Sequence, residues 1–575
     1  MLQQSYLDTG TTEQRSTDAR RTIILGTKMI YDIIKSTLGP SGMTKLITAS
    51  NAAGDMCITN DGATILKNLQ IDSPSARLLI ESSIGQDWEE GDGTTTIAIL
   101  ASLLIDEAYK LPIHPIKIIK DYEMALEKAL EVLESNAFSP QQYASSASDL
   151  FNITKTTLSS KVVKCELDLF TTICLNATYL TENINHINII KMEGNLADSQ
   201  LINGYVLDID LPIRKKETIS DQKDLLKNVK LAESTKSEDF ILNPKILIAN
   251  TAMDTDRIKI SGAQVNVSSV DELCKIEEAE RDRMKKKVDL ITKENIDIFI
   301  NRQIIYEYYF KLFREKNVIA IENVQFEGVE RLSKILKGKV ISTFDESFSQ
   351  SCDNTCDHYG TCEKVENLYM NGKRMVRFIT SSNFSDKKEN FDLNKDVLFT
   401  TNSKNQTTVS NGSATIILKG ATKEVQDEAE RAIHDALCVI YNLTSSNTNK
   451  VLLGGGCIET EVACQLTNLA ISKESSAIQA FADAVLKIPQ LIADNAGADG
   501  ESIKNKLKAL HVKNKKTFGV LVDKDGASTG CMKEKGVLES LRIKRRIFKA
   551  AVEAACLIIK CDGIIKCKPV ERRHP

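Results

Sequence analysis

The chain has no uninterrupted apolar run of the roughly 20 residues that a membrane-spanning helix needs. Residues 1–22 also lack the apolar core of a signal peptide. Neither sign of charge dominates, since 74 Lys and Arg accompany 78 Asp and Glu for a net charge of −4. No global field therefore favours nucleic acid or a membrane surface. These absences predict a soluble, cytoplasmic protein with no nucleic-acid or membrane partner.

Two common nucleotide motifs and all long repeats are missing as well. Neither G-x-x-x-x-G-K-[ST] nor G-x-G-x-x-G occurs, which excludes a P-loop and a Rossmann dinucleotide site. No segment recurs at a fixed period, so a solenoid or a propeller is not indicated.

Most of the 14 cysteines stand singly in apolar runs, where a reduced thiol behaves as a small hydrophobe. Examples are Cys174, Cys438, Cys464 and Cys556. This pattern favours a reducing compartment over a disulfide framework. One dense group, Cys352, Cys356, His358 and Cys362, has enough ligands for a zinc site. Its C-x3-C-x-H-x5-C spacing is not that of a standard zinc knuckle, and we favour an exposed polar loop.

The 575 residues are 42% hydrophobic, which is enough for about three or four domains. Both ends of the chain have helical periodicity, up to about residue 140 and again from about 423. The middle alternates short β-branched runs, such as KILIAN and IDIFINR, with helical stretches, and predicts a separate α/β unit. Within it, the charged stretch 270–292 predicts a protruding, solvated helix. The fold class is therefore multidomain α and α/β.

Gly91 through Thr96, GDGTTT, stands directly before a long apolar-periodic helix. Its backbone N–H groups and hydroxyls are suited to phosphate, because a helix N-terminus attracts anions. Asp92 would be repelled by phosphate unless a divalent cation lay between them, so it is a candidate Mg2+ ligand. A plain Asp or Thr helix cap is the alternative reading.

Three further segments strengthen the interpretation of GDGTTT as a phosphate and Mg2+ site. Thr37-Leu38-Gly39-Pro40 and the following Ser41-Gly42 end a helix and bring backbone close to a ligand, although a helix stop explains them too. Asp61-Gly62 predicts a tight turn whose carboxylate orients water. Asp435 flanks the apolar stripe of its helix, at about 110° from the centre of that stripe, and suits a second water-activating carboxylate.

Gly454-Gly455-Gly456 follows a short strand-like run and presents bare backbone to a sugar or base, with a loop hinge as the alternative. A kinase or ATPase of the actin-like fold also uses Asp-Gly-Thr turns, but there the turn joins two strands. Here GDGTTT opens a helix of about four turns, which disfavours that class.

Together these strings resemble the signature of the group II chaperonins of the eukaryotic cytosolic ring type. The resemblance extends from about Arg20 to Lys568 and includes the following runs: TLGPSGM, TNDGATILKN, QDWEEGDGTTT, TTLSSK, HDALCV, GGGC and IADNAG. Three middle runs, KILIANTAMDTDRIKI, FINRQIIYEY and FEGVERL, are typical of one particular subunit type among the paralogues of that ring.

The resemblance implies a chaperonin fold in three discontinuous domains. The equatorial ATPase domain would comprise residues 1–142 and 423–575, the hinge-like intermediate domain 143–210 and 378–422, and the apical client-binding domain 211–377. The charged stretch near 270–292 would be the lid helix. Eight different subunits would form each of two stacked rings, and ATP hydrolysis would close the lid over unfolded clients such as actin or tubulin.

Matched residue by residue, the resemblance assigns a role to most of these positions. Asp92 corresponds to the Mg2+ ligand, and Asp61 and Asp435 to the carboxylates that position water. Lys161, after Ser159 and Ser160, corresponds to the lysine of the nucleotide-sensing loop. The remaining ATP-binding positions are Thr37, Leu38, Gly39, Pro40, Gly62, Gly93, Thr94, Thr95, Thr96 and Gly455.

The chain departs from the family pattern at a few places. Cys531 stands where a G-x-x-D-M aspartate is expected at the adenosine pocket, so we expect weaker nucleotide binding. Trp88 and Glu89 put the packing near the phosphate loop in doubt. Two polar insertions, at about 215–240 and 381–412, interrupt the resemblance. A non-hydrolysing structural subunit of the same ring is the alternative function.

Overall fold

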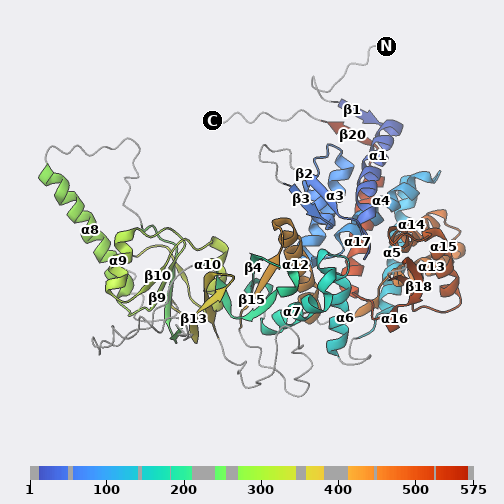
Figure 1. The fold of residues 1–575 in the computed structure, drawn as a ribbon. Helices are drawn as coiled ribbons and strands as arrows, with labels where there is room; N and C mark the ends of the chain where they lie inside the picture. Colours follow the sequence, from blue (N-terminus) through green and yellow to red (C-terminus); the bar gives the residue numbers. More distant parts are fainter. Residues whose placement is uncertain are drawn as a thin grey trace, which may run out of the picture.

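The computed structural model describes residues 12–48, 56–139, 146–181, 183–209, 240–253, 270–344, 358–380, 412–445, 450–523 and 526–566. Cys352, Cys356 and the two polar insertions, apart from their edge residues 240 and 412, lie outside this set. The described chain is elongated, with a helical part at one end, an α/β part at the other and a smaller part between them (Figure 1).

The helical part is built from both ends of the chain, as the shared periodicity predicts (Figure 1). Its helices are α1 (Ser16–Ile34), α2 (Gly62–Asn68), α3 (Pro74–Glu90), α4 (Thr94–Lys110), α5 (Pro115–Asn136), α13 (Cys457–Lys473), α14 (Ser476–Asn495), α15 (Gly500–Val512), α16 (Met532–Lys535) and α17 (Leu541–Ile559). A 3-10 turn, η1 (Lys35–Thr37), follows α1. The core draws on residues 19–153 and 439–564.

Helix α4 is the centre of this part and packs against α1, α3, α14 and α17. Ile97 through Ala101 are fully buried, because residues 97–105 of this helix are apolar apart from Ser102 and leave no face suited to water.

Four two-stranded antiparallel sheets border the helices. The pairs are β1 (Thr12–Arg15) with β20 (Gly563–Lys566), β2 (Lys45–Thr48) with β3 (Met56–Thr59), β16 (Val451–Leu453) with β19 (Leu538–Ser540), and β17 (Phe518–Asp523) with β18 (Gly526–Cys531). The first pair ties the two ends of the described chain together, with Gln14 opposite Ile564.

The middle part packs three helices on a three-stranded sheet. The elements are α6 (Ser146–Leu158), η3 (Val162–Glu166), α7 (Leu167–Leu180), η4 (Ile184–His186), β4 (Ile187–Glu193), η5 (Leu196–Asp198), β5 (Gln200–Asn203), β15 (Ala414–Gly420) and α12 (Lys423–Ser445). The strand order is β4-β15-β5, and β15 is parallel to β4 with Ile416 opposite Ile189. Helix α12 contributes Ala429, Ala432 and Ile440 to this second core.

The α/β part contains a largely parallel sheet, a second antiparallel sheet and three helices, as the middle of the sequence predicts. Their bounds are β6 (Tyr205–Leu207), β7 (Phe240–Leu242), β8 (Lys245–Ala249), α8 (Val270–Thr292), β9 (Ile298–Asn301), α9 (Glu307–Glu315), β10 (Ile319–Ile321), α10 (Phe326–Leu336), β11 (Val340–Ile341), β12 (Gly360–Thr361), β13 (Lys364–Met370) and β14 (Lys373–Ile379). The sheet orders are β10-β9-β8-β11, with β12 beside β8, and β6-β14-β13-β7. Side chains of β8 alternate between two cores, Ile246 and Ile248 on one face and Leu247 on the other.

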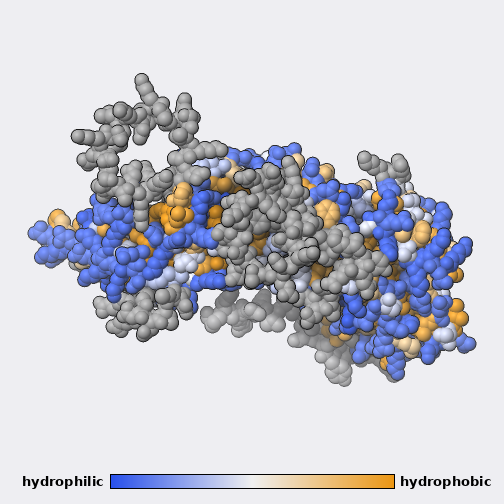
Figure 2. All heavy atoms as spheres, turned by 90° about the horizontal axis from the view of Figure 1, so that it is seen from below, coloured by the Kyte–Doolittle hydropathy of each residue, from blue (hydrophilic) through white to orange (hydrophobic). Residues whose placement is uncertain are grey.

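Helix α8 projects from the α/β part as expected (Figure 1). Only Met284, Val288 and Ile291 of this helix are buried, and they lie in its second half. The projecting end is mostly hydrophilic in the space-filling view (Figure 2). Within the described residues, no helix is long and apolar enough to span a membrane.

Candidate functional site

A cavity of about 460 Å3 lies beside the N-terminus of α4, at the junction of the helical and middle parts. Eleven of the residues predicted from the sequence line it: Thr37, Leu38, Gly39, Pro40, Asp92, Gly93, Thr94, Thr95, Thr96, Lys161 and Gly455. Asp61 and Asp435 do not line the cavity themselves, but each contacts a residue that does. Asp61 accepts a hydrogen bond from Thr94, and Asp435 accepts one from Lys161. The predicted residues are thus brought together from six separate segments of the chain.

The turn between α3 and α4 is made by two glycines in the left-handed region, Gly91 at φ 73° and Gly93 at φ 84°. They hold Asp92 between the two helices, where its Oδ1 accepts a hydrogen bond from Gly93 N at 2.7 Å. Gly93 is the N-cap of α4, and no side chain in the described part of the chain caps this helix. The first-turn N–H groups therefore remain suited to an anion in the cavity, which favours the phosphate reading over the plain-cap reading.

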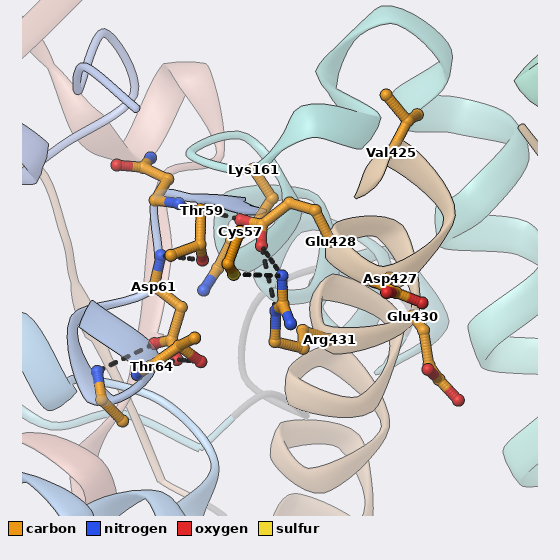
Figure 3. A network of polar contacts seen from close by, with 12 residues as sticks. Cys57, Thr59, Asp61, Thr64, Lys161, Val425, Asp427, Glu428, Glu430 and Arg431 are labelled. Carbon is orange, nitrogen blue, oxygen red and sulfur yellow. Dashed lines mark hydrogen bonds and ion pairs between the residues drawn. The ribbon is translucent and has the colours of Figure 1, made fainter. Parts of the chain in front are cut away.

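Asp61 caps the neighbouring helix α2 (Figure 3), and it also accepts a hydrogen bond from α4. Its carboxylate accepts from Thr64 N at 2.9 Å, Thr64 Oγ1 at 2.7 Å and Thr94 Oγ1 at 3.2 Å. Burial opposes ionisation of Asp61, but Lys161 and these hydrogen bonds outweigh it and lower the pKa. A Cβ at Gly62 would lie 2.9 Å from Thr95 N, so only glycine lets α2 and α4 approach this closely.

Lys161 forms a buried ion pair with Asp435, with 2.7 Å between Nζ and Oδ2. Burial favours the neutral lysine, yet Asp435, Asp61 and Asp92 together raise the pKa of Lys161. For Asp435, burial is the largest effect and raises the pKa, although Lys161 opposes it. Nearby Asp87 has a pKa raised to about 6 by burial and by Asp61.

This cluster has more carboxylates than cations. The ammonium group of Lys161 faces three aspartates. Lys155 and Lys164 also line the cavity, but Lys155 pairs with Asp168 and Lys164 donates to a backbone oxygen. The aspartate cluster itself therefore keeps an excess of negative charge. Oxygen donors in such an environment are the ligands that Mg2+ prefers, and a divalent cation would offset the excess. The residues present therefore fit a Mg2+ ion held by Asp92.

Lys544 of α17 pairs with two glutamates that the sequence analysis missed, the buried Glu459 and the partly exposed Glu539. Its Nζ lies 2.5 Å from both Glu459 Oε1 and Glu539 Oε2. All three residues line the cavity, and Glu459 Oε2 is buried without a hydrogen-bond partner among the described residues. The available signal in the sequence was the acidic Glu459, three residues after Gly456, whereas Lys544 lies in a basic stretch, LRIKRR, that is typical of a solvent-exposed surface.

The weaker nucleotide binding expected from Cys531 stays a prediction. Cys531 is not among the residues that line the cavity, and its thiol contacts Thr517 Oγ1 at 3.5 Å. Glu539 supplies another acceptor in the cavity wall.

The doubt about Trp88 and Glu89 is also resolved. Trp88 is 85% exposed on α3, and Glu89 pairs with Arg546 of α17, so neither residue disturbs the phosphate loop.

Of the four candidate zinc ligands, the structure describes His358 and Cys362. Cys362 is buried, and burial raises the pKa of its thiol to about 12. Within the ranges that the structure describes, no group of three or more His, Cys, Asp or Glu residues is arranged to hold a metal ion.

Comparison with known proteins identifies the class. The family model of the TCP-1/cpn60 chaperonins matches residues 30–569. The chain therefore belongs to this family of protein-folding chaperones, which confirms both the resemblance and the multidomain α and α/β chaperonin fold.

The relatives identify the subunit type that the middle runs resemble. T-complex protein 1 subunit beta of Encephalitozoon cuniculi is 44% identical over 99% of both chains. The human T-complex protein 1 subunit beta is 37% identical over 98% of this chain and 97% of its own. A probable T-complex protein 1 subunit beta of Schizosaccharomyces pombe is 35% identical with the same coverage. The predicted resemblance to the beta subunit is thus confirmed.

Proposed function

We propose that the chain binds Mg-ATP in this cavity and hydrolyses it, and that hydrolysis drives the folding of client proteins. One observation carries the proposal: Asp61, Asp92 and Asp435 converge around Lys161 beside the uncapped N-terminus of α4. A helix N-terminus favours phosphate, and carboxylates favour Mg2+, so both parts of Mg-ATP have suitable ligands at the same end of the cavity.

The phosphate end would work by positioning rather than by covalent catalysis. Bound Mg2+ would neutralise phosphate charge, and Asp92 is the residue that would hold it. The N–H groups and hydroxyls of Thr94 through Thr96 would hold the phosphates. Gly39, Pro40, Leu38 and Thr37 form the wall beside them.

Asp61 and Asp435 differ in how they would treat the attacking water. Asp61 has a lowered pKa and stays ionised, so it accepts a hydrogen bond from water. Asp435 is engaged by Lys161. A phosphate next to Lys161 competes for its ammonium group, which frees Asp435 to accept the proton of the water. Lys161 would thereby sense the γ-phosphate.

The sugar end would be formed by Gly455 and the hairpin β17–β18. Val520 N donates to Gly455 O at 2.8 Å, which fixes the wall, and Val520, Leu521 and Val522 line it. Glu459 and Glu539 offer acceptors for hydroxyl groups.

The chain would act as one of eight paralogous subunits in each ring of a cytoplasmic double ring, on clients of the actin and tubulin class. Residues 1–142 and 423–575 would be its equatorial domain, 143–210 and 378–422 its intermediate domain, and 211–377 its apical domain. The first hydrophobic core spans 19–153 and 439–564 and the second spans 158–201 and 414–440, so residues 429–440 of α12 pack with the middle part although these boundaries assign them to the equatorial domain.

Single-turnover ATP hydrolysis by rings that carry the wild type, Asp92→Ala or Asp435→Ala tests the proposal. We expect Asp435→Ala to keep bound ATP and to hydrolyse it at least about 100-fold more slowly, because it loses a group that acts on the water. We expect Asp92→Ala to lose Mg-ATP binding. Unchanged turnover in both variants would favour the alternative, a structural subunit that does not hydrolyse ATP.

A further inference from the structure

Helix α12 contacts the site at a second place besides Asp435. Glu428 of α12 is 2% exposed, and its Oε1 accepts a hydrogen bond from the backbone N–H of Asn60 at 3.0 Å. Its Oε2 accepts from Arg431 Nε at 3.0 Å and Nη2 at 2.8 Å. Both carboxylate oxygens of Glu428 thus have partners on the side of α12 that faces the Asp61 turn (Figure 3).

Asn60 connects this contact to the carboxylates. It directly precedes Asp61, and its side-chain Nδ2 donates to Ser160 O at 2.7 Å, next to Lys161. Glu428 lies seven residues before Asp435, which is close to two helical turns, so the two acids are on the same side of α12. One rigid helix therefore holds the Asp61 turn at one point and Lys161 at the other.

The contact also joins two separate cores. Around Glu428, helix α12 packs in the second core through Ala429 and Ala432, and only its C-terminal part, with Val439 and Leu443, reaches the first core. Helix α2, which follows Asp61, packs in the first core. The distance between Asp61 and Asp435 then depends on how the two parts dock. A charged hydrogen bond to a backbone N–H is directional and defines that docking well.

We infer that Glu428 is a positioning residue that aligns Asp61 with Asp435 by holding the Asn60 N–H, with Arg431 orienting its carboxylate. The inference rests on the proposed function. It predicts that hydrolysis needs Glu428 although this side chain does not line the cavity and has no place in ATP binding.

The test compares Glu428→Ala and Glu428→Gln with Glu430→Gln in full-length chains assembled in their ring. Glu430 is a matched control, because it lies on the same helix, points away from the turn and pairs with Lys191 at 2.6 Å (Figure 3). We expect Glu428→Ala to slow single-turnover hydrolysis about tenfold or more, since small displacements of positioned groups are costly. The KM for ATP should change less than about threefold.

Glu428→Gln keeps an oxygen acceptor for Asn60 N–H and should restore part of the rate, whereas Glu430→Gln should match the wild type. Amide hydrogen exchange provides a readout independent of turnover. Residues 60–64 should exchange faster in Glu428→Ala and at the wild-type rate in Glu430→Gln, because the N–H of Asn60 loses its acceptor.

The two proposals fail in different ways. A wild-type ring that binds ATP without hydrolysing it at this subunit would overturn the proposed function and the role of Glu428 with it. An active wild type with an equally active Glu428→Ala, or with unchanged exchange at residues 60–64, would overturn the role of Glu428 alone. A Glu428→Ala variant could also lose thermal stability and still hydrolyse bound ATP at the wild-type rate. That result would show that Glu428 stabilises the fold and does not position the catalytic carboxylates.

Discussion

At the scale of single residues, the buried carboxylate of Glu461 is kept ionised by its hydrogen-bond partners. Glu461 of α13 contacts His511 Nδ1 at 3.1 Å and Lys516 Nζ at 2.8 Å, and its side chain is 4% exposed. Burial opposes its ionisation, but hydrogen bonds from His511, Lys516 and Gln465 lower its pKa from 4.5 to about 2. The network ties α13 and α15 to β17, since His511 Nε2 lies 2.9 Å from Phe518 O.

Glu461→Gln should therefore reduce the free energy of unfolding at pH 7 by about 1–3 kcal/mol. A carboxyl with a lowered folded-state pKa stabilises the fold above its unfolded pKa, so this contribution is complete above about pH 4.5 and is lost as the pH falls toward 2. Denaturant unfolding of both proteins between pH 7 and pH 3 measures it.

The control is Glu501→Gln, which removes an exposed i,i+3 partner of Lys504 and should cost less than about 0.5 kcal/mol. Equal losses for the two variants, or a Glu461→Gln effect that does not shrink on acidification, would contradict the account of Glu461.

At the scale of elements, the start of α4 depends on one backbone conformation. Gly93 has φ 84°, and a Cβ there would lie 2.6 Å from Ile547 Cδ1 of α17. Gly93→Ala should lower the thermal midpoint and weaken ATP binding at least tenfold, because it costs about 1–3 kcal/mol of backbone strain and displaces the first turn.

Gly85→Ala is the matched control. Gly85 lies inside α3, and a Cβ there meets nothing within 4 Å. This change should leave nucleotide binding intact and stabilise the chain by about 0.5–1 kcal/mol, since alanine loses less backbone entropy than glycine in a helix. Isothermal titration with Mg-ATP and thermal unfolding separate the two variants; normal ATP affinity in Gly93→Ala would argue against a phosphate site at α4.

At the scale of the whole molecule, the second polar insertion separates two strands of different parts. The insertion lies between β14 and β15, outside the described residues apart from residue 412, and its composition is polar and poor in apolar residues. Deleting residues 385–408 should leave assembly of the chain into its ring unchanged, because no apolar stripe suited to packing is removed. Size-exclusion chromatography of co-expressed subunits tests this, and failure to enter the ring would refute it.

The sequence by itself determined the elements and most of the residue types of the site. The periodicity of residues 94–110 and 423–445 was sufficient to predict α4 and α12, because an amphipathic or wholly apolar pattern specifies a helix locally. The Gly91–Thr96 run marked the start of α4 in the same way. Asp435 was expected beside the core rather than in water, and it is 6% exposed.

Only the tertiary structure decided which of these residues meet. The ion pair of Lys161 with Asp435 and the bond of Glu428 to Asn60 N join positions 274 and 368 residues apart, which no local pattern specifies. Lys544 lies in the basic run LRIKRR, which does not indicate its partners, and the packing of α17 places it between Glu459 and Glu539. Such pairings depend on the docking of whole helices and cores, because a side chain's partner is determined by the relative position of two rigid elements rather than by its neighbours in sequence.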